Sequence, residues 1–146
     1  MKKIKQKILI TGCAGFIGFH LCKRLLNNNQ FLVIGLDNLN NYYDIKLKKD
    51  RLNILKKNKK NFNFHKIDLI NFKKLNNIFK TNKFDVVVNL AAQEGVRYSI
   101  SNPDEYYQSN IKGFYNLLDL CKAYNTSHLL FASTSSVYGN NKKFPI

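Results

Sequence analysis

The sequence contains no tryptophan, a single methionine, two prolines and only three cysteines in 146 residues. The cysteines, Cys13, Cys22 and Cys121, are odd in number and form no C-x-x-C pair, which argues against both a disulfide framework and a zinc site. Each lies where a small buried residue would fit, so we expect three reduced thiols that serve packing, and no bound metal. No apolar stretch approaches the roughly 18 residues that a membrane-spanning helix needs, so we expect no membrane segment.

The length of the chain indicates how many domains it has, and its first residues indicate its compartment. A chain of 146 residues is about one domain long and buries roughly two thirds of its unfolded surface in a single core. Residues 1–5 lead into a short strand and carry no secretory hydrophobic region with a cleavage site. We therefore expect a cytoplasmic protein.

Acidic residues are also scarce. The sequence has nine of them against 24 basic residues, so its formal net charge is +15. Such a charge can indicate nucleic-acid binding. However, 21 of the basic residues are lysines and three are arginines, whereas proteins that recognise bases favour bidentate arginine. Asparagine (21) and isoleucine (13) are abundant too, and all three types have A/T-rich codons, so genome composition explains the charge and we expect no nucleic-acid function.

The densest basic run, residues 46–60, alternates with Leu47, Leu52, Ile54 and Leu55. This pattern predicts a helix with a solvated basic face and an apolar underside.

Short β-branched runs alternate with helical patterns along the chain. Strands are predicted at residues 7–10, 31–36, 62–66, 86–90 and 128–132, and helices at 16–28, 45–57, 72–80 and 104–124, the last with Asn102 as its cap and Pro103 in its first turn. Alternating strands and helices with right-handed crossovers predict an α/β fold, a doubly wound parallel sheet of order 3-2-1-4-5 that is covered on both faces. Ligands then bind at the carboxyl ends of the strands.

A glycine-rich turn follows the first predicted strand. Gly12, Gly15 and Gly18 are spaced three residues apart and open a helix, so backbone N–H groups and the positive end of the helix dipole meet a pyrophosphate. Asp37 ends the second strand and lies 19 residues beyond Gly18, close to the roughly 20 expected for a carboxylate that binds an adenosine ribose. The sequence therefore predicts a dinucleotide site for NAD rather than NADP.

Several motifs in the right order resemble the extended short-chain dehydrogenases/reductases, the NAD-dependent epimerase/dehydratase family of nucleotide-sugar enzymes. They are Thr11-Gly12-x-x-Gly15-Phe16-Ile17-Gly18, Asp68-Leu69, Asn89-Leu90-Ala91-Ala92 and Ser133-x-Ser135-Ser136-Val137-Tyr138-Gly139. The stretches at residues 37–44, 91–100 and 102–103 look most like the UDP-glucuronate 4-epimerases, with the sugar-nucleotide 4,6-dehydratases as the alternative. Glu94 and Cys13 depart from the small residues expected at their positions. The family implies a Rossmann-type fold, NAD and a UDP-sugar substrate.

The resemblance also implies roles for individual residues. Gly12, Gly15, Phe16, Ile17 and Gly18 would cradle the pyrophosphate, Asp37 and Asn38 would bind the ribose, Asp68 and Leu69 would edge the adenine, and Leu90, Ala91, Ala92 and Gln93 would line the nicotinamide half. Thr134 matches the catalytic Ser/Thr that hydrogen-bonds the sugar 4-hydroxyl, and Ser135 and Ser136 would face the sugar. Without the resemblance, the serines and threonine at 133–136 would be a polar strand exit that caps backbone groups.

The family also carries a Tyr-x-x-x-Lys pair on one helix, in which the lysine lowers the pKa of the catalytic phenol. Two stretches fit the spacing, residues 42–46 and 138–142, but the first lies at the ribose end and the second forms a glycine-containing loop. We expect the true pair beyond residue 146. Residues 1–146 would then be a truncated dinucleotide-binding domain, incomplete at its carboxyl end, without a substrate domain and inactive alone.

Two further possibilities concern the partners of the chain. It could be a non-catalytic NAD-binding module, or the first half of a split enzyme whose complementing chain supplies the tyrosine. A homodimer through the predicted helix at 104–124 is the other expected association, because this superfamily commonly dimerises through such helices.

Overall fold

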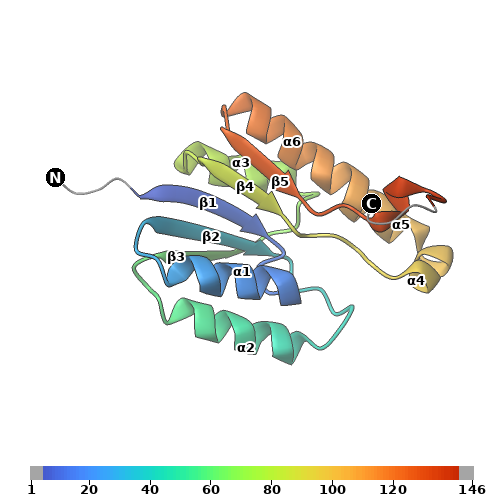
Figure 1. Ribbon diagram of the computed structural model, residues 1–146, viewed down its shortest axis with the longest axis horizontal. Coiled ribbons are helices and arrows are strands. Elements are labelled where there is room, and N and C mark those ends of the chain that lie inside the picture. Colours follow the sequence, from blue (N-terminus) through green and yellow to red (C-terminus); the bar gives the residue numbers. More distant parts are fainter. Residues whose placement is uncertain (1–4, 142–146) are drawn as a thin grey trace.

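The computed structural model describes residues 5–141 and shows a five-stranded parallel sheet of order β3-β2-β1-β4-β5, as predicted (Figure 1). The strands are β1 (Gln6–Thr11), β2 (Phe31–Asp37), β3 (Phe62–Lys66), β4 (Val86–Asn89) and β5 (His128–Phe131). Thr11, at the end of β1, pairs with Leu36 on one side and Asn89 on the other. The carboxyl ends of β2, β1 and β4 therefore meet at one edge of the sheet.

Helices cover both faces of this sheet (Figure 1). They are α1 (Phe16–Leu26), α2 (Ile45–Lys56), α3 (Phe72–Thr81), α4 (Val96–Ser101), α5 (Pro103–Tyr106), the π-helix η1 (Tyr107–Gly113), α6 (Phe114–Ala123) and the 3₁₀-helix η2 (Ser135–Tyr138). Ile8 and Ile10 of β1 pack under α1 and α2, whereas Leu9 packs under α3 and α6. Successive strand residues point to opposite faces, so one strand serves both core layers.

The segment before α6 differs from its prediction. One helix was predicted over 104–124, but the structure has α5, then the π-helix η1, then α6, and the separate helix α4 was not predicted. Asn102 does occupy the N-cap position, here of the shorter helix α5, but its side chain makes no capping bond and donates to the Ser101 hydroxyl instead. Pro103 does occupy the first turn of α5.

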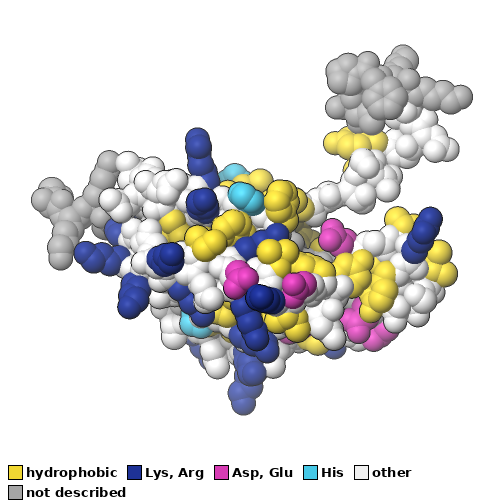
Figure 2. All heavy atoms as spheres, turned by 90° about the horizontal axis from the view of Figure 1, so that it is seen from below, with side chains coloured by type: hydrophobic (Ala, Val, Ile, Leu, Met, Phe, Trp, Pro, Cys, Tyr) yellow, Lys and Arg dark blue, Asp and Glu magenta, His cyan; other side chains and the backbone are white. Residues whose placement is uncertain are grey.

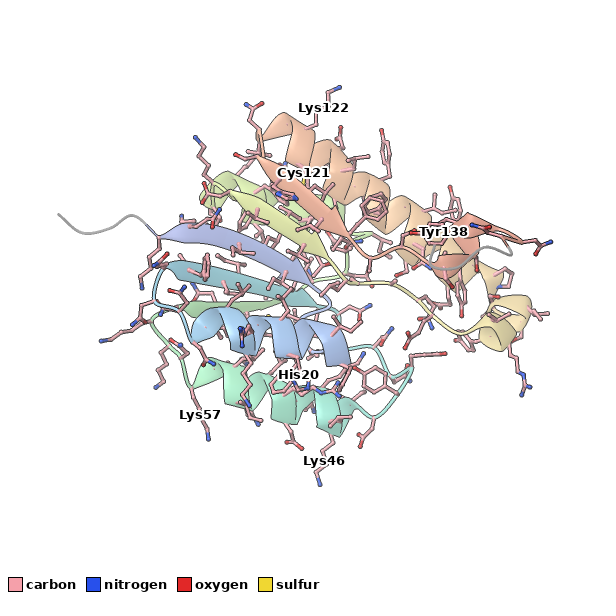
Figure 3. The ribbon with its side chains drawn as sticks, in the orientation of Figure 1. His20, Lys46, Lys57, Cys121, Lys122 and Tyr138 are labelled. Carbon is pink, nitrogen blue, oxygen red and sulfur yellow. The ribbon has the colours of Figure 1, made fainter. Side chains whose placement is uncertain are left out.

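The basic helix α2 is only partly as predicted. Leu52 and Leu55 are buried, but Leu47 and Ile54 are exposed, so the apolar underside is narrower than the sequence indicates. Lys46 and Lys57 project from its two ends (Figure 3), and basic side chains are scattered over this side of the molecule and do not form one stripe (Figure 2). Lys48 is buried instead, where its ammonium donates to the carbonyl and side-chain oxygens of Asn40 at 3.0 and 2.5 Å.

All three cysteines are free and buried, as predicted. Cys13 and Cys22 are fully enclosed in the layer under α1 and α2, and Cys121 packs in the opposite layer. Burial raises the pKa of Cys22 from 9.0 to about 12 and raises the pKa of Cys13 well above 9.0. Removal of a thiol from water disfavours the thiolate, so both groups stay protonated at neutral pH.

We expect Cys22 to make the fold sensitive to alkali. Its contribution to the free energy of unfolding is complete below pH 9 and is lost between pH 9 and about 12, because in that range only the unfolded thiol releases its proton. The loss is about 1.4 kcal/mol per pH unit. In urea unfolding, the stability difference between the wild-type chain and Cys22→Ala should shrink by about this amount from pH 8 to pH 10. A constant difference would contradict the expectation.

Candidate functional site

The glycine-rich turn joins β1 to α1 at the carboxyl edge of the sheet. Gly12 adopts φ +68°, and the N–H of Gly15 donates to the Gly12 carbonyl at 3.0 Å, which closes the turn. A β-carbon on Gly12 would lie 2.9 Å from the backbone of Leu90 and Ala91, so only glycine allows the segment after β4 to approach this closely. Gly12 therefore has both a conformational and a steric reason to be glycine.

The first turn of α1 presents backbone donors. Gly15 is the N-cap and makes no side-chain capping bond, and the first turn contains no acidic residue. The N–H groups of Phe16, Ile17 and Gly18 have no acceptor within the helix, because they precede its first i to i−4 bond. The side chains of Phe16 and Ile17 are about two-thirds exposed. This helix end has the donors and the dipole direction that an anion needs.

Asp37, the last residue of β2, lies next to the turn. Its carboxylate accepts from the N–H of Ala14 at 3.1 Å and from the N–H of Leu39 at 2.9 Å, and the residue is buried. Each carboxylate oxygen keeps lone pairs for a further donor. Two backbone bonds thus orient a negative charge beside the turn, in the position where the sequence predicts a ribose.

Asp68 and Leu69, the predicted adenine residues, follow β3, and Asn38, which is predicted to bind the ribose, follows β2. The Asn38 side chain donates to Asp68 at 2.9 Å, and both border a small polar cleft of about 160 Å³. Its lining residues are Asn38, Asn40, Asp68, Ile70, Gln93, Glu105, Gln108 and Ser109. Leu69 does not line this cleft, because its side chain is buried in the core layer under α3 and α6.

Thr11 and Asn110, whose roles the sequence did not predict, fix the segment after β4. The fully buried Thr11 hydroxyl donates to the Asn89 side chain at 2.6 Å and accepts from the N–H groups of Leu90 and Ala91 at 3.2 and 3.1 Å. Asn110 of η1 binds both backbone groups of Gln93. Its side-chain oxygen accepts from the Gln93 N–H at 2.7 Å, and its side-chain nitrogen donates to the Gln93 carbonyl at 2.8 Å. Ala92, between these anchors, is exposed.

Thr134 follows β5 and caps the short helix η2. Its hydroxyl accepts from the N–H of Ser136 at 3.2 Å and lies 3.3 Å from the Ser136 hydroxyl. Thr134, Ser135 and Ser136 are all exposed. Tyr138 lies in this same segment (Figure 3). Because β5 runs parallel to β4, Thr134 follows the strand at the same edge of the sheet as the glycine turn.

Neither stretch with Tyr-x-x-x-Lys spacing forms a helical pair in the described part of the chain. Tyr42 precedes α2, whose N-cap is Asp44, whereas Lys46 lies inside that helix. Tyr138 ends η2 and is followed by Gly139 at φ +62°, and Lys142 lies outside the described residues.

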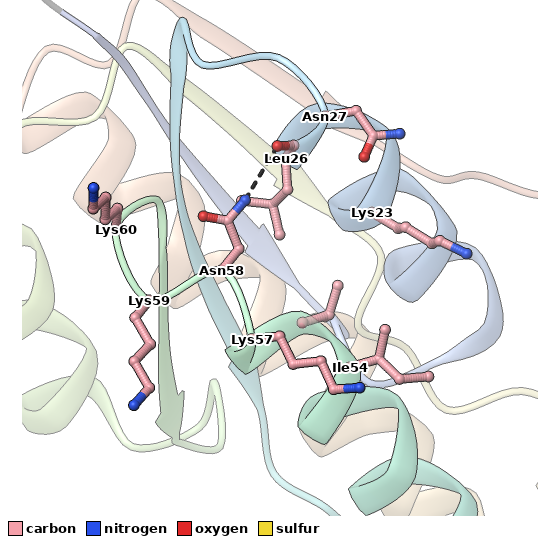
Figure 4. A pocket seen from close by; sticks show the side chains of 9 residues that line it. Lys23, Leu26, Asn27, Ile54, Lys57, Asn58, Lys59 and Lys60 are labelled. Atoms are coloured by element: carbon pink, nitrogen blue, oxygen red, sulfur yellow. Dashed lines mark hydrogen bonds between the residues drawn. The ribbon is translucent and has the colours of Figure 1, made fainter.

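A larger hollow of about 590 Å³ lies at the opposite edge of the sheet, between the ends of α1 and α2 (Figure 4). Lysines 23, 57, 59 and 60 surround Leu26, Ile54 and Leu55 there. Lysines near helix carboxyl ends complement the helix dipole, which accounts for the charge. Within residues 5–141, no three metal-ligating side chains cluster, and no helix is long and apolar enough to cross a membrane.

Comparison with known proteins identifies relatives of this chain. Residues 9–146 match the family model described as GDP-mannose 4,6 dehydratase. The chain is 51% identical over 140 residues to the protein CapI of Staphylococcus aureus, covering 96% of this chain and 41% of CapI. It is 49% identical over 130 residues to the UDP-glucuronate 4-epimerase of Thermodesulfobacterium geofontis, covering 89% of this chain and 40% of that enzyme.

Solved structures show the same relationship. The UDP-glucuronic acid 4-epimerase of Bacillus cereus, crystallised with UDP-glucuronic acid and NAD, superposes with a TM-score of 0.85 at 37% identity, over 94% of this chain and 43% of that one. The UDP-glucose 4-epimerase of Bifidobacterium longum, in complex with NAD⁺ and UDP, gives 0.81 at 30% identity. The chain thus spans about two fifths of these relatives and has their Rossmann-type fold. It belongs to the family that the GDP-mannose 4,6-dehydratase model describes, the NAD-dependent nucleotide-sugar epimerases and dehydratases.

Proposed function

We propose that this chain is the NAD-binding part of an epimerase that inverts carbon 4 of UDP-glucuronate. The observation that carries the proposal is the buried Asp37 carboxylate, held by two backbone N–H groups beside a turn with free helix donors. Backbone donors for an anion, beside a carboxylate that can accept from a ribose, suit a dinucleotide without a 2′-phosphate. Relatives named as UDP-glucuronate 4-epimerases at 44–49% identity support the choice of sugar.

The residues present fit NAD along the carboxyl edge of the sheet. Gly12, Gly15 and the N–H groups of residues 16–18 would bind the pyrophosphate, and Asp37 with Asn38 would bind the ribose. Asp68 borders the polar cleft where adenine would lie, with the adjacent Leu69 contributing through its backbone. Residues 90–93, fixed by Thr11 and Asn110, would line the nicotinamide half. When bound, NAD would supply reversible hydride transfer at carbon 4 of the sugar.

Thr134 would hold the sugar 4-hydroxyl, with Ser135 and Ser136 beside the sugar. Its hydroxyl oxygen already accepts from the Ser136 N–H, so a sugar hydroxyl would be oriented against a fixed partner. A threonine hydroxyl keeps its proton near neutral pH and is a poor general base. We therefore infer that these 146 residues alone bind the cofactor without epimerising the sugar.

A 4,6-dehydratase is the second candidate, because the family model that matches carries that activity in its description. An NAD-binding module without catalysis, or one half of a split enzyme, would use the same cofactor contacts. A homodimer through α5, η1 and α6 is supported by the exposed side chains of Ile111, Tyr115 and Leu118 on these helices. The proposed compartment is the cytoplasm.

Calorimetric titration of the 146-residue chain with NAD tests the proposal. We expect saturable binding that Asp37→Ala weakens roughly 10- to 100-fold, because hydrogen bonds to a charged group contribute about 1.5–3 kcal/mol. NADP should bind more weakly than NAD to the wild-type chain, since its 2′-phosphate would face the Asp37 carboxylate.

Asp119→Ala is the matched control, because Asp119 is an exposed carboxylate on α6, outside the proposed site. It should bind NAD like the wild type. Absence of NAD binding by a sample with a cooperative unfolding transition would refute the proposal, and formation of the 4-epimer of UDP-glucuronate would refute the inferred inactivity.

A further inference from the structure

The glycine turn is held at Ala14 by side chains from two other elements. Ala14 is fully buried; its N–H donates to Asp37 of β2 at 3.1 Å, and its carbonyl accepts from Arg51 Nη1 of α2 at 3.1 Å. The Tyr43 hydroxyl lies 3.5 Å from the same carbonyl. Two successive peptide groups of the turn are thus bound by side chains that lie 23 and 37 residues further along the chain.

Arg51 makes more than one contact here. The same guanidinium nitrogen donates to the Tyr43 hydroxyl at 3.2 Å, and the guanidinium carbon lies 5.9 Å from the centre of the Phe16 ring. Arg51 therefore touches the residues on both sides of Gly15, the N-cap of α1. A half-buried arginine with partners at these three points loses the freedom to swing toward solvent.

The carbonyl contact decides which role Arg51 can have. A peptide group is planar, with its C=O and N–H pointing in opposite directions, so fixing the Ala14 carbonyl also fixes the N–H of Gly15. That N–H closes the turn on the Gly12 carbonyl, and the next N–H groups, of Phe16 and Ile17, are the free helix donors. Arg51 binds the acceptor side of the turn, whereas an anion binds its donor side.

We propose that Arg51 is a positioning residue that fixes the glycine turn in its diphosphate-binding conformation, with Tyr43 as its support. This inference rests on the proposed NAD binding. The side chain acts through the Ala14 carbonyl and makes no contact with the dinucleotide. Its loss lets the peptide between Ala14 and Gly15 rotate, so the donors at residues 16 and 17 no longer converge on one anion.

The test compares Arg51→Met, which keeps a long side chain without donors, with the wild type. The Kd for NAD and for ADP should rise about tenfold, whereas the Kd for adenosine, which lacks phosphates, should change less than twofold. Amide hydrogen exchange without ligand should become faster in residues 12–18 and stay unchanged in β3 and α3. Lys49→Met, an exposed residue on the same helix, is the control and should alter neither measurement.

Arg51→Lys provides a second variant if Arg51→Met fails to fold, and its single ammonium should restore part of the NAD affinity. Unchanged NAD affinity and unchanged exchange in both variants would overturn the proposal. A loss of NAD affinity without faster exchange in residues 12–18 would also overturn it, since Arg51 would then contact the ligand directly. If the wild-type chain binds no NAD, the proposed function fails, but the exchange measurement still tests whether Arg51 orders the turn.

Discussion

Gly18→Ala should destabilise the chain by about 3 kcal/mol or abolish its cooperative unfolding transition. In most helices, replacement of glycine by alanine is favourable by about 1 kcal/mol, because alanine has the higher helix propensity. Here the new β-carbon would lie 2.1 Å from the Gly12 carbonyl oxygen and 2.9 Å from the Cys13 α-carbon. Backbone atoms cannot turn aside as a side chain can, so α1 must move away from the turn.

Gly15→Ala is the matched control within the same turn. Its β-carbon would lie 3.1 Å from the Gly12 oxygen, and the backbone of Gly15 has φ −67°, which alanine adopts without strain. A shift of a few tenths of an ångström relieves that contact, so we expect a loss of about 1 kcal/mol or less. Urea unfolding followed by circular dichroism measures both variants. Equal stability of Gly18→Ala and the wild type would show that the helix does not pack on the turn as described.

The sheet could be predicted because its determinants are local. Each strand is a short apolar run, and each connection contains a helical pattern, so the right-handed crossover rule leaves few topologies. All five strands lie where the sequence placed them, to within one residue at either end. The order then brings Gly12, Asp37 and Asn89 to one edge of the sheet, which is why the position of the site could also be predicted.

The support of the site could not be predicted, because it depends on contacts between residues far apart in sequence. Thr11 and Ala91 are 80 positions apart, and Arg51 reaches Ala14 from a helix whose basic residues are predicted to be solvated. The π-helix η1, which places Asn110 opposite Gln93, has no characteristic hydrophobic period. Thr11, a polar residue that ends the apolar strand β1, is the one indication of these supporting contacts that the sequence offered.

These supporting contacts converge on the glycine turn and on the adjacent segment after β4. Asp37 and Arg51 hold Ala14 from β2 and α2, while Thr11 holds the backbone of Leu90 and Ala91 from β1. Gly12 lies close to the backbone of Leu90 and Ala91, so the glycine turn and the segment after β4 are in contact. The two parts of the candidate site are therefore held in place by protein contacts alone, which would lower the entropy cost of binding the proposed NAD.

Thr11→Val should cost about 3 kcal/mol or more, although valine has nearly the shape of threonine. The substitution leaves the Asn89 side-chain oxygen and the N–H groups of Leu90 and Ala91 without their partner. Thr11 is fully buried, so water cannot easily replace the hydroxyl, and each unpaired group costs about 1–3 kcal/mol. We also expect faster amide exchange at Leu90 and Ala91, because the hydroxyl is the acceptor that protects both N–H groups.

Thr11→Ser separates the hydroxyl from the methyl group of threonine. Serine keeps the donor and acceptor at the same position and removes one buried methyl, so it should cost about 1 kcal/mol and leave the exchange of Leu90 and Ala91 slow. If Thr11→Ser is the more destabilising of the two variants, packing of the methyl group and not the hydroxyl stabilises this junction. If Thr11→Val is harmless, the segment after β4 is ordered by Asn110 alone, and Asn110→Leu should then accelerate exchange from Leu90 through Gln93.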